Sequence, residues 1–454
     1  MDSFKYIIYI IVFASLIGCA SDDSESSEAQ PIPLSENLNL DFNKWIYSQM
    51  NHNYLWREDM PDSLDCNYDL EPIKFFKSLL SSKDRFSYCK KNDYYSPSDR
   101  NCNVGYEYQT YVIKTGEEIR NVLYVTSREL KEKGLKRGDV ILSTDDGRQI
   151  VRIDINGNKI VSVDTLEATN PFEQINTVYL DSIYHINGHK IGYLCYLQFE
   201  YSDDLVPSLK RFYDAQIDEM ILDLRYNPGG YVSTCKYLSN SLVNEKGYNK
   251  IFQQCTYNDV LTREYEKTTG SGITVNPFKT PDNGVGILGN PMYGLNLKRL
   301  FVLTSKYSAS ASEAAIISMR PFMDVILIGE QTYGKGVGSW TIRDNRFKYQ
   351  LQPITMRYHN AVMETTPDEG LVVDYYVPDG YDTKKKELGD LQEPLLAKAI
   401  GLISGTEVEN KSSGAKAIGD TMSHDIPYDL KITKVGDPSF FIKFNKSQAI
   451  FQQE

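Results

Sequence analysis

A Ser-Ala-Ser-Ala-Ser run at 308–312 follows the apolar residues 300–303 and precedes a pattern typical of a helix. Its middle serine, Ser310, therefore stands at the junction of a predicted strand and a predicted helix. A helix N-terminus has free N–H groups and a partial positive charge, and both stabilise an alkoxide and an oxyanion. Ser310 is thus a candidate nucleophile, although capping of the helix by Ser310 or Ser312 is the ordinary role of a serine here.

A lysine between two glycines, Lys335, follows the apolar run 325–328. Glycines on both sides allow the loop to adopt backbone angles that other residues avoid. A lysine acts as a base only when its ammonium form is disfavoured, which requires burial away from water and carboxylates. Serine with lysine is an established form of nucleophilic catalysis without histidine. The two segments therefore predict a Ser/Lys dyad, with a solvated loop lysine as the alternative.

The combination of these segments resembles the carboxyl-terminal processing (tail-specific) proteases. In that family the middle serine of Ser-Ala-Ser-Ala-Ser-Glu is the nucleophile, and a lysine in a Gly-Lys-Gly loop is the general base. Here that lysine follows Ser310 by 25 residues. A third segment, Asp-Leu-Arg-Tyr-Asn-Pro-Gly-Gly at 223–230, is similar to the family motif whose glycine N–H helps to form the oxyanion hole. The oxyanion donors that the resemblance implies are the N–H groups of Gly229 or Gly230 and of Ala311.

The segment 127–142 is similar to the PDZ domain that these proteases carry. PDZ domains bind a peptide as an added strand and hold its terminal carboxylate on backbone N–H groups. The best candidate for the carboxylate loop makes Gly105, Tyr106 and Tyr108 the peptide-binding residues. Glu107 in this loop would repel a substrate carboxylate if its side chain pointed inward, so tail specificity is supported less directly than serine protease chemistry.

One position of the expected site departs from the family. The family often has Gln four residues after the lysine, where it orients the amine, and this chain has Ser339. A hydroxyl can hydrogen-bond the amine as the third member of the site, but it reaches less far. This departure leaves open an alternative, in which a catalytically weak or inactive surface lipoprotein keeps the fold and binds peptides.

The elements that must position these residues alternate between strand and helix, which predicts an α/β layer. The resemblance implies a crotonase/ClpP-like α/β protease core with an inserted or preceding PDZ-like β domain and an N-terminal helical cap. The predicted division is a lipoprotein signal peptide at 1–19, an acidic flexible tether at 20–36, an N-terminal helical domain at 37–98, a PDZ-like domain at 99–190, a Ser/Lys protease core at 191–405 and a C-terminal extension at 406–454.

The first residues favour export. An apolar run over residues 6–18 is too short to span a bilayer but suits a signal peptide. Its ending, Leu-Ile-Gly-Cys, resembles a lipobox, in which Cys19 is acylated, and the acidic residues behind it are similar to the surface-export signal of Bacteroidetes-type lipoproteins. We therefore expect a protein anchored by lipid to the outer membrane, on its periplasmic face or at the cell surface.

Export permits disulfides. Cys89 and Cys102 flank a polar loop and could pair, whereas Cys195 lies in an apolar strand pattern and is expected to be a buried free thiol.

Composition and motifs argue against other classes. The net charge of −12 and the lack of a long Lys/Arg run exclude a typical nucleic-acid binder. The five histidines form no HExxH motif, so no metal and no other cofactor is expected.

Two short motifs resemble those of other enzyme classes. Residues 329–336 match the P-loop pattern except at Gly336, which stands where Ser or Thr would bind Mg²⁺, so no nucleotide is expected. Residues 233–236 fit S-x-x-K, but the partner motifs of penicillin-binding enzymes are absent. The expected partners are protein or peptide substrates.

Overall fold

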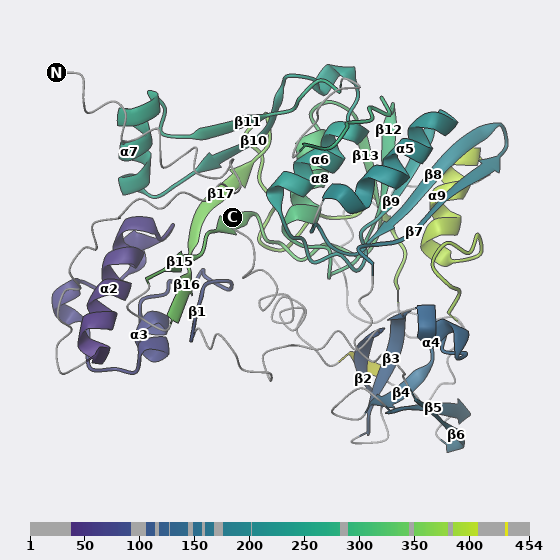
Figure 1. Cartoon of the computed structure of the whole chain (residues 1–454), viewed down its shortest axis with the longest axis horizontal. Coiled ribbons are helices and arrows are strands. Elements are labelled where there is room, and N and C mark those ends of the chain that lie inside the picture. The colour runs from purple at the N-terminus through teal and green to yellow at the C-terminus, as the bar shows by residue number, and fades with distance from the viewer. Residues whose placement is uncertain are drawn as a thin grey trace, which may run out of the picture.

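The computed structural model shows an N-terminal helical body, a central α/β core and a small β body (Figure 1). It describes residues 38–91, 106–113, 118–126, 128–143, 149–156, 159–167, 176–200, 202–281, 289–344, 349–379, 385–406 and 432–434. No helix within these ranges is both long enough and apolar enough to cross a membrane.

The core is built on a six-stranded sheet in the order β18-β13-β12-β9-β8-β7. Its strands are β7 (Val178–Ile186), β8 (His189–Tyr196), β9 (Glu219–Asp223), β12 (Arg299–Thr304), β13 (Asp324–Gly329) and β18 (Tyr375–Tyr376). Neighbours from β8 to β18 run parallel, whereas β7 forms an antiparallel hairpin with β8. Parallel strands buried on both faces need nearly continuous apolar sequence, and all five residues of β9 are buried.

Helices cover both faces of this sheet, which confirms the predicted α/β layering. The helices α5 (Val206–Ala215), α6 (Val232–Leu242) and α8 (Ala311–Met319) share one hydrophobic cluster with Leu222 of β9. The helix α9 (Pro394–Ser404) packs on the other face, in a cluster that contains Ile221. Successive side chains of a strand point to opposite faces, so adjacent residues of β9 anchor the two layers.

The ends of α9 show how the sequence sets its limits. The Glu393 carboxylate accepts a hydrogen bond from the Leu396 N–H at 3.0 Å, and Pro394 occupies the first turn. Proline suits that position because the N–H that it lacks has no partner within the helix. The helix ends at Gly405, which has a φ of +68°, the left-handed conformation that favours glycine.

A second, antiparallel sheet leads from the core toward the N-terminal body (Figure 1). Its order is β11-β10-β17-β14, with β10 (Ile251–Thr256), β11 (Thr274–Pro277), β14 (Val337–Ser339) and β17 (Ile354–His359), and the helix α7 (Asp259–Thr269) connects β10 to β11. β14 follows the loop of Lys335 directly. The position of that loop is therefore tied to this sheet as well as to β13, which precedes it.

The N-terminal body contains α2 (Leu38–Asn53), two 3₁₀ turns (Arg57–Asp59 and Ser63–Asp65) and α3 (Pro72–Ser78). Phe42, Ile46 and Phe75 form its hydrophobic cluster with Leu351 from the core side. Within the stretch predicted to be helical, Tyr88–Lys91 instead forms the strand β1. β1 pairs with β16 (Tyr349–Gln352), whose other neighbour is β15 (Ile342–Arg343). This pairing across more than 250 residues of sequence is a tertiary effect that local periodicity does not reveal.

The small β body is an antiparallel sheet in the order β19-β2-β3-β4-β5-β6. Its elements are β2 (Tyr106–Ile113), β3 (Glu118–Thr126), the helix α4 (Arg128–Glu132), β4 (Val140–Ser143), β5 (Gln149–Asn156), β6 (Lys159–Glu167) and β19 (Ile432–Lys434). Leu123, Leu130 and Ile141 lie in its hydrophobic cluster. β19 comes from the C-terminal extension and pairs antiparallel with β2.

Among the described cysteines, Cys195 is a buried free thiol, as predicted. Cys89 is also a buried free thiol, on β1, so the proposed pairing of this residue with Cys102 is not supported. Cys102 lies outside the described residues. Burial raises the pKa of the Cys89 thiol to about 12, because the thiolate form would be poorly solvated there.

A buried network of charges joins the β body to the core. Arg225 is fully buried and binds Glu393 through both terminal nitrogens, at 2.6 and 2.9 Å, and Asp223 through Nε at 3.0 Å. Arg137 of the β body binds Asp379 at 2.8 Å. Although burial opposes ionisation, Arg137 and Lys385 hold the pKa of the Asp379 carboxyl well below its ordinary value. Buried charges persist only when they are paired in this way.

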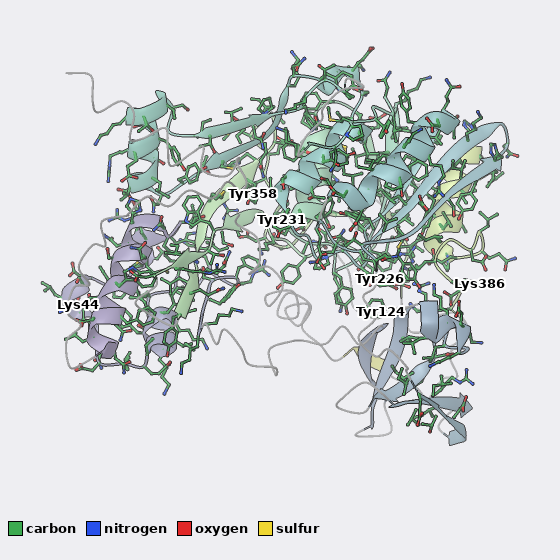
Figure 2. The ribbon with its side chains drawn as sticks, in the orientation of Figure 1. Lys44, Tyr124, Tyr226, Tyr231, Tyr358 and Lys386 are labelled. Carbon is green, nitrogen blue, oxygen red and sulfur yellow. The ribbon has the colours of Figure 1, made fainter. Side chains whose placement is uncertain are left out.

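Aromatic contacts accompany this network at the same junction. Tyr124 of β3 and Tyr226 of the core lie next to each other where the β body meets the core (Figure 2), with ring centroids 4.4 Å apart. The Tyr226 hydroxyl also accepts a hydrogen bond from Arg137 at 2.7 Å. The interface therefore combines apolar packing with paired charges.

The network predicts a strong effect of Arg225→Met on stability. The substitution leaves the Asp223 and Glu393 carboxylates buried without their cation, which should lower the free energy of unfolding by about 3–5 kcal/mol. Urea unfolding measures this value. The control is Arg211→Met, because the exposed Arg211 pairs with Asp181 at the surface and this pair should contribute about 0–1 kcal/mol. Equal losses in the two variants would contradict the account of the buried network.

Candidate active site

Ser310 lies in a strained turn between β12 and α8. Its φ is +56° and its ψ is −112°, a combination that residues other than glycine avoid. The Ser312 N–H donates to the Ala309 carbonyl at 3.1 Å and closes this turn. These angles are those of the first central position of a type II′ turn, where glycine is usual. The fold thus stores strain of about 1–3 kcal/mol at the predicted nucleophile, as occurs at functional sites.

Hydroxyl groups on both sides of Ser310 hold the turn in place. Ser308 Oγ donates to the Leu224 carbonyl at 2.8 Å, and Ser312 Oγ donates to the Asn227 carbonyl at 2.9 Å. Both flanking serines are fully buried, whereas Ser310 is partly exposed. The outer serines of the motif therefore fasten the turn to the segment after β9, and the middle serine presents its side chain.

The Glu313 carboxylate joins the two segments that carry the predicted dyad. Its Oε2 accepts hydrogen bonds from the backbone N–H of Ser310 at 2.9 Å and from that of Lys335 at 2.8 Å. Its Oε1 accepts from the Gly334 N–H at 2.8 Å and from Thr332 Oγ1 at 2.5 Å. Because one oxygen receives both N–H groups, the backbones of Ser310 and Lys335 lie side by side, as the dyad requires.

Glu313 is fully buried in the first turn of α8. Burial raises the pKa of its carboxyl, and the four hydrogen bonds oppose that shift. A carboxylate that accepts four donors has its charge spread over them, and the N-terminus of α8 also favours negative charge at this place. Glu313 is therefore a buried acceptor that fixes the geometry of its neighbours.

Lys335 is half-buried, and its Nζ lies 5.4 Å from the ring centroid of Phe86. The two flanking glycines are required by close backbone contacts. A Cβ on Gly334, whose φ is +88°, would lie 2.1 Å from the Asp368 carbonyl oxygen, and a Cβ on Gly336 would lie 2.7 Å from that of Thr366. The glycines thus let the loop pack against residues 366–368.

The glycine pair after β9 lies against the Ser310 turn. A Cβ on Gly229 would lie 2.8 Å from the Cβ of Ser310 and 3.0 Å from the nitrogen of Ala311. The Gly229 N–H is engaged, since it donates to Asn227 Oδ1 at 2.9 Å. In the part of the chain that the structure describes, no acceptor binds the N–H of Gly230 or of Ala311. This geometry favours Gly230 over Gly229 as the second oxyanion donor.

Comparison with known proteins identifies the family of this site. Models of peptidase family S41 and of the peptidase S41 N-terminal domain match residues 190–377 and 41–88. The matched residues include the Ser310 turn, the Lys335 loop and the glycine pair. The chain belongs to peptidase family S41, a family of serine peptidases.

Two curated relatives of this S41 peptidase are processing proteases. It is 25% identical over 189 residues to a carboxyl-terminal-processing protease of Picosynechococcus, an alignment that covers 41% of this chain and 39% of the relative. It is 23% identical over 154 residues to a carboxy-terminal processing protease of Bacillus subtilis, covering 33% and 26%. The chain thus spans well under half the length of these relatives.

The fold of this S41 peptidase is also found in a crystal structure. The structure is of a Bacteroides fragilis protein described as an S41 protease, with a TM-score of 0.65 at 23% identity. The match covers 80% of this chain and 98% of that one. It supports a shared mixed α/β fold.

Ser339 lies on β14 and contacts Gln352 of β16. Gln352 Nε2 donates to Ser339 Oγ at 2.9 Å, and its Oε1 accepts from Thr341 Oγ1 at 2.6 Å. The position where the family often has Gln is therefore linked to a glutamine of β16, a strand that belongs to another sheet. No sequence signal indicated Gln352, because only strand pairing brings it to β14.

The other predicted residues lie elsewhere. Tyr106 begins β2 in the small β body, and Tyr108 follows on the same strand. Gly105 and the lipidation residue Cys19 lie outside the described residues. The sequence analysis did not assign a role to Glu313, although its spacing from Ser310 fits the S-x-x-E capping box. That spacing was the signal by which it could have been found.

The position of Glu313 predicts that Glu313→Gln loosens the Lys335 loop. A neutral amide cannot accept all four hydrogen bonds, and each unsatisfied buried N–H costs about 1–3 kcal/mol. Amide hydrogen exchange at Gly334 and Lys335 should therefore accelerate about 5- to 150-fold. Glu369→Gln is the control, because Glu369 is exposed close to the same loop. Unchanged protection in Glu313→Gln would rule out this anchoring role.

Proposed function

We propose that this S41 peptidase is an endopeptidase that cleaves exported proteins or peptides near unstructured C-termini. Ser310 forms the acyl-enzyme and Lys335 is the general base. The observation that carries this proposal is the Glu313 carboxylate, which holds the backbones of both residues on one oxygen. The strained φ of Ser310 and the adjacent glycine pair support the same assignment.

The first step forms the acyl-enzyme. Lys335, with its amine uncharged, accepts the proton of the Ser310 hydroxyl while the oxygen attacks the carbonyl carbon of the substrate. The oxyanion of the tetrahedral intermediate accepts hydrogen bonds from the N–H groups of Ala311 and Gly230. Each donor is worth about 2.7–4 kcal/mol. The Lys335 ammonium then protonates the leaving amine, and the peptide bond breaks.

The second step releases the product. Lys335 accepts a proton from water as the water oxygen attacks the acyl carbon. The bond between that carbon and Ser310 Oγ then breaks, Lys335 returns the proton to Oγ, and the product leaves as a carboxylic acid. Ser339 is the proposed orienting partner of the Lys335 amine. Its oxygen would accept an N–H of the amine, which leaves the amine lone pair free for the Ser310 proton. The hydrogen bond from Gln352 supports this role, because it holds the Ser339 oxygen in place and leaves the second lone pair of that oxygen available.

The small β body is the proposed substrate-delivery domain. Gly105, Tyr106 and Tyr108 would receive the peptide, which adds to β2 as a strand. β19 pairs with residues 111–113 on this edge of β2, so the peptide would pair beside residues 106–110 of the same edge. The network of Arg137 joins this body to the core and would couple peptide binding to the site.

The proposed mechanism predicts that Ser310→Ala and Lys335→Ala each reduce kcat/KM on an unstructured peptide by at least about 10³-fold. Peptide binding should stay unchanged, because neither substitution removes the proposed delivery site. The cleavage assay uses mass spectrometry, and binding is measured by fluorescence anisotropy. Lys306→Ala is the control, since this half-buried lysine lies close to the Ser310 turn. Equal cleavage by wild type and both variants would refute the dyad, and binding without any cleavage by wild type would favour the inactive peptide-binding alternative.

Anchoring by lipid at Cys19 is proposed for the location of the protein, on the evidence of the lipobox-like sequence. In a host that processes lipoproteins, Cys19→Ser should move the protein from the outer-membrane fraction to the soluble exported fraction. Cys66→Ser is the control, because it changes a different cysteine. Retention of Cys19→Ser in the membrane fraction would argue against the anchor.

A further inference from the structure

The N-terminal body reaches the proposed general base through the segment that follows α3. Arg85 Nη2 donates to the Gly334 carbonyl and to the Asp368 carbonyl, each at 2.8 Å. Gly334 directly precedes Lys335, and residues 366–368 are the backbone against which this loop packs. One side chain from the N-terminal body thus binds both the Lys335 loop and the backbone at Asp368, against which that loop packs.

The segment that carries Arg85 is itself well fixed. Asp84 Oδ1 accepts from the N–H groups of Phe86 and Ser87, at 2.8 and 2.9 Å. Asp84 Oδ2 accepts from the hydroxyl of the fully buried Tyr54 at 2.8 Å. Ser87 Oγ in turn accepts from the Ile354 N–H of β17 at 2.8 Å. These hydrogen bonds therefore fix the backbone position of Arg85 against the N-terminal body and β17.

The side chains of Arg85 and Lys335 both lie near the aromatic ring of Phe86. Arg85 Cζ lies 5.0 Å and Lys335 Nζ 5.4 Å from its centroid. Phe86 is 7% exposed and packs with Val337 and Ile354, so its ring also keeps water away from one side of the amine. An arginine keeps its proton in proteins. The repulsion between the two cations is therefore relieved when Lys335 gives up its proton.

Other charged groups face the same loop. The Glu313 carboxylate favours the ammonium form of Lys335, but its charge is shared among four donors. Arg357 lies opposite Val337 on β17, and Asp368, at 3.7 Å from Arg357 and largely exposed, is screened by solvent. Arg85 is also exposed, but its two hydrogen bonds to backbone carbonyls hold its charge at the ring that the amine shares.

We propose that Arg85 is a positioning residue for Lys335, which holds the loop backbone and favours the uncharged amine. This inference rests on the proposed function of Lys335 as general base. It makes the docked N-terminal body a part of the catalytic machinery, since a body that separates from the core would take this cation with it.

The test measures ionisation of Lys335 directly. The full-length mature protein with Ser310→Ala is labelled with trace acetic anhydride between pH 6 and 11, and peptide mass spectrometry follows acetylation of Lys335. Arg85→Gln keeps a hydrogen-bond donor but removes the charge, and Arg85→Lys keeps the charge. We expect Arg85→Gln to raise the apparent pKa of Lys335 by about one pH unit and Arg85→Lys to leave it near the parent value.

In active protein, Arg85→Gln should move the acid limb of kcat/KM upward by the same amount, while Arg85→Lys restores the original profile. Arg211→Gln is the control for loss of an exposed arginine. An unchanged pKa in Arg85→Gln, or equal shifts in Arg85→Gln and Arg85→Lys, would overturn the proposal. Failure of the dyad is seen separately, as cleavage that survives Lys335→Ala, because the labelling readout needs no activity.

Discussion

One buried carboxylate determines whether the proposed site exists. Glu313 accepts hydrogen bonds from Ser310, Gly334 and Lys335, which belong to segments separated in sequence by the helix α8 and the strand β13. A fully buried carboxylate is costly unless its oxygens are satisfied. The folded state that satisfies them is the one that brings the two backbones together. The same contacts that make burial of Glu313 tolerable therefore assemble the proposed nucleophile and base.

Strain at Ser310 becomes tolerable for a related reason. The turn is fastened by the hydroxyls of Ser308 and Ser312, by the Gly229 backbone beneath it and by the Glu313 carboxylate. A backbone in an unfavourable region persists only when its surroundings over-determine it. These contacts together hold the Ser310 backbone in its unfavourable conformation, and they leave the Ser310 side chain partly exposed. Preorganisation of this kind means that the proposed oxyanion donors need not rearrange during the reaction.

The β body and the N-terminal body are joined to the core by directional polar contacts. Arg137 ties the β body to Asp379 and Tyr226, and Arg85 ties the N-terminal body to the loop of Lys335. Hydrogen bonds to charged groups are short and directional, so these contacts help to orient each body against the core. The core supplies the proposed catalytic residues, and the N-terminal body binds the loop of Lys335.

The sequence by itself determined the α/β alternation of the core, because apolar periodicity and helix-capping residues act locally. It also determined the candidate residues Ser310 and Lys335 and the glycines that their loops require. Only the tertiary structure decided that Gly229 donates to Asn227, which leaves Gly230 for an oxyanion, and that Ser339 meets Gln352. It also decided that residues 88–91 form a strand and that Arg85 reaches Gly334. These features depend on contacts between residues far apart in the chain, whose register is set by packing and strand pairing and leaves no local pattern.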